Sequence, residues 1–222
     1  CPISSENCAR FREYIHLIFE TNKKFNLTGF SSIQDIAEKL VLASIEPFFS
    51  LNVPHGTKFL DMGSGSGIPG IPLAIAFEEL TGTLVDSNAK KINFIQSVIL
   101  QLGLSNACAL LGRGEELAHD ASFRGSFFFS ISRAFSNLYT TCEICAPLVE
   151  IGGFLYIYAN DALPEASFHP ALCNHFSELG IRPATIAERL SLGLGEKNIV
   201  FIKTSSTPMK YPRRFSVIKR EA

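Results

Sequence analysis

The stretch FLDMGSGSGIPGIPLAIAF, residues 59–77, decides the fold of this 222-residue chain. An apolar run ends at Asp61, and an apolar segment that contains two prolines begins about ten residues later. Four glycines lie between and at the start of that segment: Gly63, Gly65, Gly67 and Gly70. Glycines this dense between a strand and a helix indicate a backbone that must pass close to a ligand.

Short apolar runs and helical patterns alternate on both sides of this glycine loop. The runs typical of strands are residues 57–62, 82–86, 107–112, 127–132, 152–159 and 199–204. The helical patterns between them are residues 71–77, 89–103 and 138–149. This alternation predicts an α/β fold of the Rossmann-like type, with a mostly parallel, doubly wound sheet and helices on both faces.

Two further segments flank this alternating region. Residues 5–25 and 33–49 have helical spacing of apolar residues, and the stretch from Lys203 to Arg220 carries six Lys or Arg and no acid. We therefore predict three parts: an N-terminal helical extension over residues 1–50, a Rossmann-like domain over residues 51–204 and a basic C-terminal tail over residues 205–222.

The composition narrows the class of protein. With 46% hydrophobic and 18% charged residues the chain is globular, and its net charge of −1 provides no overall attraction for nucleic acid. The six scattered cysteines are typical of reduced thiols in a cytoplasmic protein, and no apolar run is long enough to span a membrane. Cys142 and Cys145 share one helical face, which favours buried thiols over a metal site.

The glycine loop fits two cofactors. Gly65, Gly67 and Gly70 satisfy G-x-G-x-x-G, the dinucleotide pattern, and Asp86 follows Gly67 by 19 residues, where an acid accepts hydrogen bonds from ribose hydroxyls. Asp61 with the first three glycines gives D-x-G-x-G-x-G, the S-adenosylmethionine pattern. The acid before the glycines and the helical extension favour a methyltransferase. A nicotinamide-dependent oxidoreductase is the alternative, although no plausible proton donor stands out.

Longer motifs give a specific family resemblance. In chain order they are NKKFNLT, DMGSGSGIPGIPLAI, LVDSNAKKINFI, RGEEL, ISRAF and TPMKYPRR. With these motifs the chain resembles, over nearly its whole length, the RsmG (GidB) family of bacterial 16S ribosomal RNA methyltransferases. The resemblance implies a class I methyltransferase fold, S-adenosylmethionine as cofactor, and methyl transfer to N7 of one guanine of 16S ribosomal RNA, naked or in the small ribosomal subunit.

The resemblance also supplies candidate site residues. Together with the glycine pattern, it predicts a cofactor site made of Asp61, Gly63, Gly65, Gly67, Ile68, Asp86, Ser87, Gly114, Glu115 and Arg133. Arg133, in the ISRAF motif, is the candidate catalytic residue, which would contact guanine O6 or the carboxylate of the cofactor. A structural salt bridge of Arg133 with Glu115 or Asp86 is the alternative.

Some positions depart from the family pattern. Lys39, Leu40 and Ala43 stand where the family usually has Arg, His and Asp. Phe128 replaces a common acid, and Tyr158 replaces an expected lysine. These departures keep open a further alternative, an RNA-binding protein with the same fold and weakened catalysis.

The predicted chemistry needs no general base. Guanine N7 has a free lone pair in the neutral base, so the enzyme mainly has to align the nucleophile, the methyl carbon and the sulfur. The sequence shows neither an Asn-Pro-Pro-Tyr motif for amine methylation nor a cysteine nucleophile for pyrimidine carbon methylation.

RNA contact must rest on local cations. The candidate RNA-binding residues are Lys90, Lys91, Lys210, Arg213 and Arg214. A solvated helix start for the first two residues, and a solvated tail for the others, are the alternatives. We expect a monomer with no metal and no membrane contact.

Overall fold

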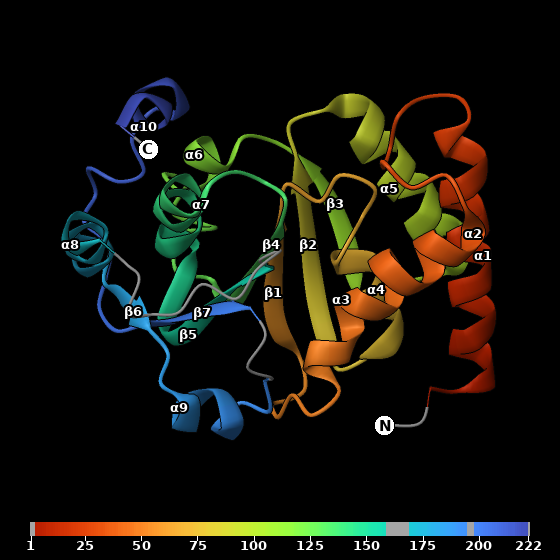
Figure 1. The fold of residues 1–222 in the computed structure, drawn as a ribbon, viewed down its shortest axis with the longest axis horizontal. Helices are drawn as coiled ribbons and strands as arrows, with labels where there is room; N and C mark the ends of the chain where they lie inside the picture. The colour runs from red at the N-terminus through yellow and green to blue at the C-terminus, as the bar shows by residue number, and fades with distance from the viewer. Residues whose placement is uncertain (1–2, 159–168, 195–197, 222) are drawn as a thin grey trace.

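A single twisted sheet forms the centre of the molecule in the computed structural model, which describes residues 3–158, 169–194 and 198–221 (Figure 1). In the described part of the chain the sheet has seven strands in the order β3-β2-β1-β4-β5-β7-β6. They are β1 (Thr57–Met62), β2 (Leu80–Asp86), β3 (Ala107–Leu111), β4 (Phe127–Arg133), β5 (Val149–Tyr158), β6 (Ile181–Pro183) and β7 (Ile199–Lys203). The Rossmann-like prediction is therefore confirmed.

Helices cover both faces of this sheet. On the N-terminal side lie α1 (Ser5–Asn22), α2 (Ile33–Asp35), the π-helical η1 (Ile36–Leu42), α3 (Ala43–Ile45), the 3₁₀-helical η2 (Glu46–Phe48), α4 (Gly70–Ala76) and α5 (Ala89–Leu102). The remaining helices are α6 (Gly114–Leu117), α7 (Leu138–Cys145), the 3₁₀-helical η3 (Ala146–Leu148), α8 (Pro170–Glu178), α9 (Ile186–Ser191) and α10 (Phe215–Glu221).

The strand pattern predicts the parallel part of the sheet well. β1 pairs in parallel with β2 and β4, β2 with β3, and β4 with β5. β7 runs antiparallel to β5, and β6 antiparallel to β7. The direction of β7 and the existence of the three-residue β6 were missed, because so short a strand has no detectable periodicity. Ala159, the last residue of the predicted fifth strand, lies outside the described residues.

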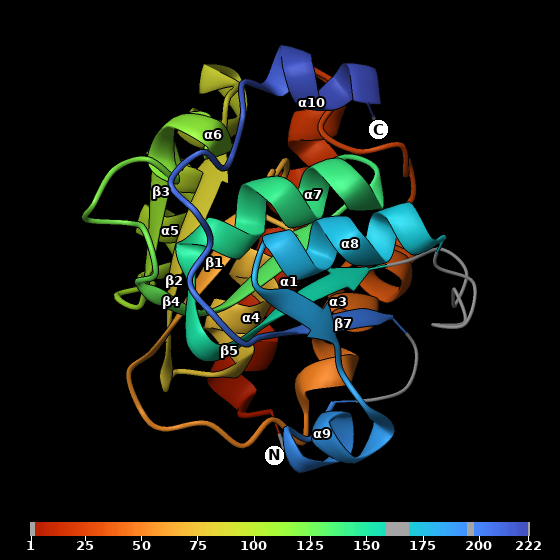
Figure 2. The same cartoon turned by 90° about the vertical axis from the view of Figure 1, so that its left-hand side faces the viewer.

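Each face of the sheet has its own apolar core. One core joins the strands to the N-terminal extension through Phe11, Tyr14 and Ile18 of α1. The other joins them to α7, α8 and the C-terminal tail, where Tyr211 and Ile218 are buried. The two views show these helices on opposite sides of the strands (Figure 2). The predicted extension and tail therefore both contribute to the core of the domain.

The N-terminal helices differ in detail from the predicted pair. The first ends at Asn22, whose side-chain oxygen accepts hydrogen bonds from the N–H groups of Leu27 and Thr28. The second is not one regular helix but passes from α2 through η1 and α3 to η2. Within its π-helical segment, the carbonyls of Lys39 and Leu40 accept hydrogen bonds from the side chain of Arg133.

Candidate cofactor and substrate site

The carboxyl ends of the parallel strands bring the predicted cofactor residues to one edge of the sheet. Asp61 lies in β1, Asp86 ends β2, and Gly114 begins α6 just after β3. In Figure 1 these strand ends point upward, toward the loop that carries the glycines. Neighbouring parallel strands thus assemble a site from residues that are far apart in the chain.

The glycine loop is tied to β2 and leaves one open position. The N–H groups of Gly63 and Ser64 donate to the Val85 carbonyl over 2.8 and 2.9 Å. Gly63, Gly65 and Gly67 all have positive φ, a conformation that glycine adopts without strain. A Cβ added at Gly65 would meet only one backbone oxygen, at 3.9 Å, so this part of the loop faces open space.

Asp61 places a carboxylate beneath this loop. It is fully buried, and its Oδ2 accepts the Gly70 N–H over 2.8 Å. Its Oδ1 has no hydrogen-bond partner among the described residues. Burial raises the pKa of this carboxyl to about 7, because charge is costly away from water. The buried acceptor is suited to a group that brings positive charge or a donor.

The absence of a side chain at Gly70 allows its N–H to reach the Asp61 carboxylate. A Cβ at Gly70 would lie 2.6 Å from Leu84 Cγ and 2.7 Å from Asp61 Oδ2. Ile68, between the loop and α4, is buried in the core on the N-terminal face.

Asp86 connects the loop to the start of α5. Its Oδ2 accepts the Gly65 N–H over 3.0 Å, and its Oδ1 accepts the Asn88 N–H over 2.9 Å. Asn88 in turn caps α5 by accepting the Lys90 N–H. Ser87 is exposed between them. Since an ionised carboxylate has about four acceptor sites, Asp86 can still accept further hydrogen bonds.

Gly114 and Glu115 follow β3 on the side away from α1. A Cβ at Gly114 would lie 2.4 Å from Ile144 Cγ2 and 2.9 Å from Met62 Sδ, so the glycine permits contact between α6, α7 and β1. Glu115 is partly buried, and its carboxylate lies 4.0 Å from the Arg113 guanidinium.

Arg133 is the last residue of β4, as expected, but its contacts are ones that the sequence did not predict. Its guanidinium donates to the carbonyls of Lys39 and Leu40, in η1, and to Ser44 Oγ. Tyr158, beside it on β5, donates to the Ser44 carbonyl. Neither Glu115 nor Asp86 forms an ion pair with Arg133 among the described residues, so the alternative salt bridge is wrong. Arg133 instead fastens the N-terminal extension to the sheet edge.

Two residues near the loop escaped the sequence interpretation. The hydroxyl of Tyr14 in α1 donates to the Ser66 carbonyl over 2.8 Å and so supports the glycine loop from the extension. Phe135 packs on Gly63, where a Cβ would lie 2.4 Å from its Cδ2. The only available signal for Phe135 was its place directly after the arginine and alanine of the ISRAF motif.

The candidate RNA-binding cations fall into two groups. Lys90 is exposed at the start of α5, and Lys91 Nζ lies 3.7 Å from Asp86 Oδ2. Lys210 pairs with Glu178 in α8, whereas Arg214 is exposed. In Figure 1 both the start of α5 and α10 lie toward the edge that holds the strand carboxyl ends.

Arg213 is engaged inside the molecule. Its guanidinium donates twice to the carboxylate of Glu143, at 3.0 and 2.8 Å, and once to the hydroxyl of Tyr139. Glu143 is completely buried in α7. These contacts bind the tail to the domain, and an ion pair between Arg213 and Glu221 connects two parts of the tail itself. The basic tail is therefore a docked segment in which Arg213 serves the fold.

The two cysteines of the C-x-x-C pattern are buried in α7, as predicted. Burial raises the pKa of Cys145 to about 12 and that of Cys142 well above its usual value. Within residues 3–158, 169–194 and 198–221, no group of three His, Cys, Asp or Glu side chains is placed to hold a metal ion. No helix in the same part of the chain is long and apolar enough to cross a membrane.

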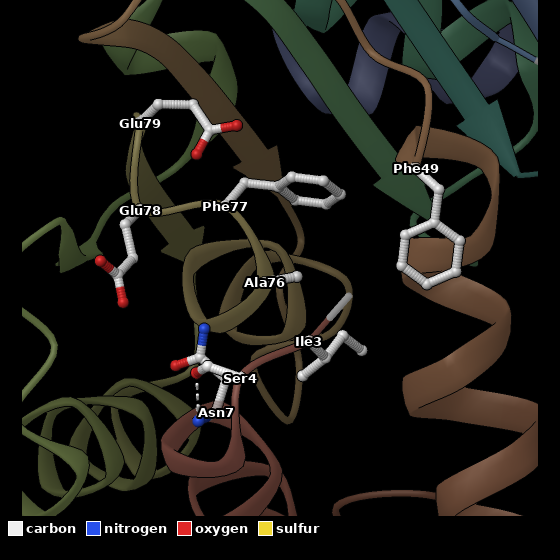
Figure 3. Close-up of a pocket in the computed structure, with 8 residues that line it drawn as sticks. All are labelled: Ile3, Ser4, Asn7, Phe49, Ala76, Phe77, Glu78 and Glu79. Carbon is white, nitrogen blue, oxygen red and sulfur yellow. Dashed lines mark hydrogen bonds between the residues drawn. The ribbon is translucent and has the colours of Figure 1, made fainter. Parts of the chain in front are cut away.

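A cavity of about 240 Å³ lies at the opposite edge of the sheet (Figure 3). Asn7 at the start of α1, Phe49 after η2, and Phe77 with Glu78 before β2 are among its lining residues. None of the predicted cofactor residues lines it. The candidate site is thus the edge of the sheet formed by the carboxyl ends of the parallel strands, around Asp61, Gly65 and Asp86, and not this cavity. We call this edge the strand-end edge.

Comparison with known proteins gives consistent relatives. The GidB family profile, described as rRNA small subunit methyltransferase G, matches residues 7–178. Ribosomal RNA small subunit methyltransferase G of Streptococcus pneumoniae (strain ATCC BAA-255 / R6) is 31% identical over 218 residues, which cover 96% of this chain and 90% of that protein. The protein of the same name from Fervidobacterium nodosum is 34% identical over 206 residues and 93% of both chains.

Among solved structures, the aminoglycoside resistance methyltransferase NpmB1 is similar with a TM-score of 0.51 and 16% sequence identity. The match covers 72% of this chain and 91% of that chain. At this level of identity the likeness concerns the fold alone.

Proposed function

Because the chain belongs to the rRNA small subunit methyltransferase G family, we propose that it transfers a methyl group from S-adenosylmethionine to N7 of a guanine in 16S ribosomal RNA. The observation that carries this proposal in the structure is the buried Asp61 carboxylate with its unpartnered Oδ1, beneath a glycine loop that faces open space at Gly65.

The charge at this position discriminates between the two cofactors considered. S-adenosylmethionine carries an ammonium and a sulfonium, and a carboxylate at the loop favours both. The pyrophosphate of a dinucleotide is an anion that needs unopposed N–H donors at the same loop. Asp61 therefore supports S-adenosylmethionine and disfavours NAD.

We assign the remaining residues around it as follows. Asp86 accepts hydrogen bonds from the ribose hydroxyls, next to Ser87, while its contacts to Gly65 and Asn88 hold the loop in place. Gly63, Gly67 and Ile68 shape the loop. Gly114 and Glu115, beyond β3, border the adenine.

The cofactor supplies a methyl group that its sulfonium has already activated. Since guanine N7 carries a free lone pair, none of the protein's groups has to remove a proton. The residues of the chain orient the two reactants and exclude water, an effect of up to about 7–11 kcal/mol in favourable systems.

Arg133 has a positioning role in this proposal. Its guanidinium donors are used by the carbonyls of Lys39 and Leu40 and by Ser44 Oγ, so it holds the N-terminal extension against the site. These bonds occupy three of the five guanidinium N–H groups, so a contact of the same guanidinium with substrate or cofactor would use the two that remain.

The partner is 16S ribosomal RNA or the small ribosomal subunit that contains it, and Lys90, Lys91 and Arg214 are among the cations that the strand-end edge offers to it. The protein acts as a monomer in the cytoplasm, where its RNA substrate is assembled. Of the three predicted parts, the described residues of 1–50 brace the site, those of 51–204 hold the cofactor, and those of 205–222 cover the opposite face of the sheet.

Ligand binding followed by methyl transfer tests the proposal. Calorimetric titration should show binding of S-adenosylmethionine and none of NAD, and labelled methyl groups should pass to 16S ribosomal RNA. Binding of NAD alone would favour an oxidoreductase. Binding of cofactor and RNA without transfer would identify a member of the family with weakened catalysis.

A further inference from the structure

Phe135 lies at the boundary between the two halves of the strand-end edge. β1 has β2 and then β3 on one side, where the proposed cofactor residues lie, and β4 on the other. Phe135 follows β4 by two residues, and its ring contacts Gly63, the residue directly after β1. A planar base that approaches from the β4 side toward a methyl donor over the glycine loop would meet this ring.

The residues before and after Phe135 in the chain hold its ring in place. Before it, Arg133 is anchored by hydrogen bonds to the carbonyls of Lys39 and Leu40. After it, Asn137 caps α7 by accepting the Thr140 N–H over 2.9 Å. Between these anchors Ala134 has a φ of 54°, which a residue with a Cβ rarely adopts and which turns the chain so that Phe135 faces Gly63.

The side chain remains partly exposed although it packs on the second core. An aromatic ring that is both fixed and accessible beside a glycine loop can contact a ligand without a rearrangement of the core.

N7 methylation places a positive charge on the guanine, which an aromatic ring could stabilise. The N7 lone pair forms the new bond to the methyl carbon, the electron pair of the broken S–C bond stays on sulfur, and no proton moves. The positive charge therefore passes from the sulfonium to the purine ring. The face of an aromatic ring attracts a cation through its quadrupole, and it also stacks on unpaired bases.

We propose that Phe135 is a catalytic residue that stacks on the target guanine and stabilises the positive charge that the base acquires. This proposal rests on the proposed N7 methylation. It assigns to the phenylalanine that follows the β4 arginine both substrate positioning and transition-state stabilisation.

Kinetics of substituted proteins form the first part of the test. Phe135→Leu keeps an apolar side chain of similar size but removes the ring, and it should lower kcat about 3- to 30-fold while the affinity for S-adenosylmethionine stays unchanged. Phenylalanine analogues with increasing fluorination at position 135 should lower kcat progressively, because fluorine weakens the quadrupole.

Phe123→Leu is the matched control, since Phe123 is also a partly buried phenylalanine of the second core but lies before the amino end of β4. It should leave kcat unchanged. Equal kcat for wild type and Phe135→Leu, or for the whole fluorinated series, would overturn the proposal. A wild-type protein that forms no N7-methylguanine would instead refute the proposed function.

A binding experiment provides a readout without turnover. With the protein saturated by S-adenosylhomocysteine, NMR titration should show tighter binding of 7-methylguanosine monophosphate than of guanosine monophosphate, at a pH that keeps the methylated base cationic. Phe135→Leu should reduce this ratio about threefold or more, and Phe123→Leu should not. A wild-type protein that shows no preference, or that binds neither nucleotide, contradicts the proposal.

Discussion

The burial of Asp61 should lower the free energy of unfolding at the pH values where its carboxyl ionises. Its folded pKa of about 7 lies above the ordinary value of 3.8, so the folded state binds the proton more tightly between these values. The free energy of unfolding should therefore fall as pH rises through this window, by on the order of 3 kcal/mol between pH 5 and pH 8.

Asp61→Asn tests this expectation, since the amide oxygen can still accept the Gly70 N–H but the group no longer ionises. Denaturant unfolding at pH 5 and pH 8 should show a smaller pH-dependent loss in the variant than in wild type. The difference between the two proteins cancels the contributions of other titrating groups. Identical pH dependence would mean that Asp61 is ionised throughout and is stabilised by a partner.

Asp86 should contribute mainly to cofactor affinity. Its carboxylate bridges Gly65 and Asn88, and charge-assisted hydrogen bonds contribute about 1.5–3 kcal/mol each. Asp86→Ala is therefore expected to weaken binding of S-adenosylmethionine by one to two orders of magnitude, as measured by calorimetric titration. Asp120→Ala is a suitable control, because that exposed carboxylate lies away from the candidate site and accepts its hydrogen bonds from Ser122. Unchanged affinity of Asp86→Ala would remove it from the site.

For single residues, the sequence predicts the place in a strand or turn better than it predicts the contacts of the side chain. The motif places Asp61 and the glycines correctly, because their roles depend on spacing along a strand and turn. The contacts of Arg133 depend on carbonyls of η1 that are more than 90 residues away in the chain. Pairings at such separation arise only from packing, so no local pattern indicates them.

The tail is joined to α7 by an ion pair between Arg213, which is partly exposed, and Glu143, which is fully buried. Loss of the Arg213 side chain leaves Glu143 buried without its main partner, which typically costs about 3–5 kcal/mol. We expect Arg213→Ala to lower the free energy of unfolding by this order. Arg214→Ala, at the exposed neighbouring position, should change it by less than about 0.5 kcal/mol. Equal effects of the two substitutions in urea unfolding would contradict the described packing.

α10 and the residue before it offer the exposed cations of the tail. If Arg214, Lys219 and Arg220 bind RNA phosphates, their joint replacement by glutamine should make the salt dependence of RNA binding shallower. On single strands the logarithmic slope should fall by about 0.7 for each phosphate that the variant no longer neutralises.

Lys58→Gln, near the amino end of β1, should leave that slope unchanged and serves as the control. Full truncation of the tail would be less informative, because Tyr211 and Ile218 belong to the core. An unaltered slope in the triple variant would direct the search for the RNA surface to Lys90 and Lys91.

The elements themselves differ in how far sequence determines them. β1 and α5 have clear periodicity and begin and end as predicted, within one residue. β6 was not predicted, because three residues are too few to show a periodicity. The π-helical segment was not predicted either, because distant donors such as Arg133 stabilise it. The docked tail was missed because its charges obscured the two buried apolar residues.

In the whole molecule, the residues proposed for cofactor binding and methyl transfer lie at one edge of the sheet. The carboxyl ends of β1 and β2 supply Asp61 and Asp86, and β4 leads to Phe135. The N-terminal extension braces this edge through Tyr14 and the Arg133 contacts, while the cavity of Figure 3 lies at the other end of the strands. The account therefore makes methyl transfer to RNA the single function of this edge.

Mapping of N7-methylguanine in 16S ribosomal RNA tests that claim most directly. Small ribosomal subunits, and 16S ribosomal RNA freed of protein, are taken from cells that lack the gene and incubated with the purified protein and S-adenosylmethionine. Chemical cleavage at N7-methylguanine and primer extension then locate the modified base. The account predicts one new cleavage site in at least one substrate, which is absent when the cofactor is omitted. No new site in either substrate, with the cofactor shown to be bound, would contradict it.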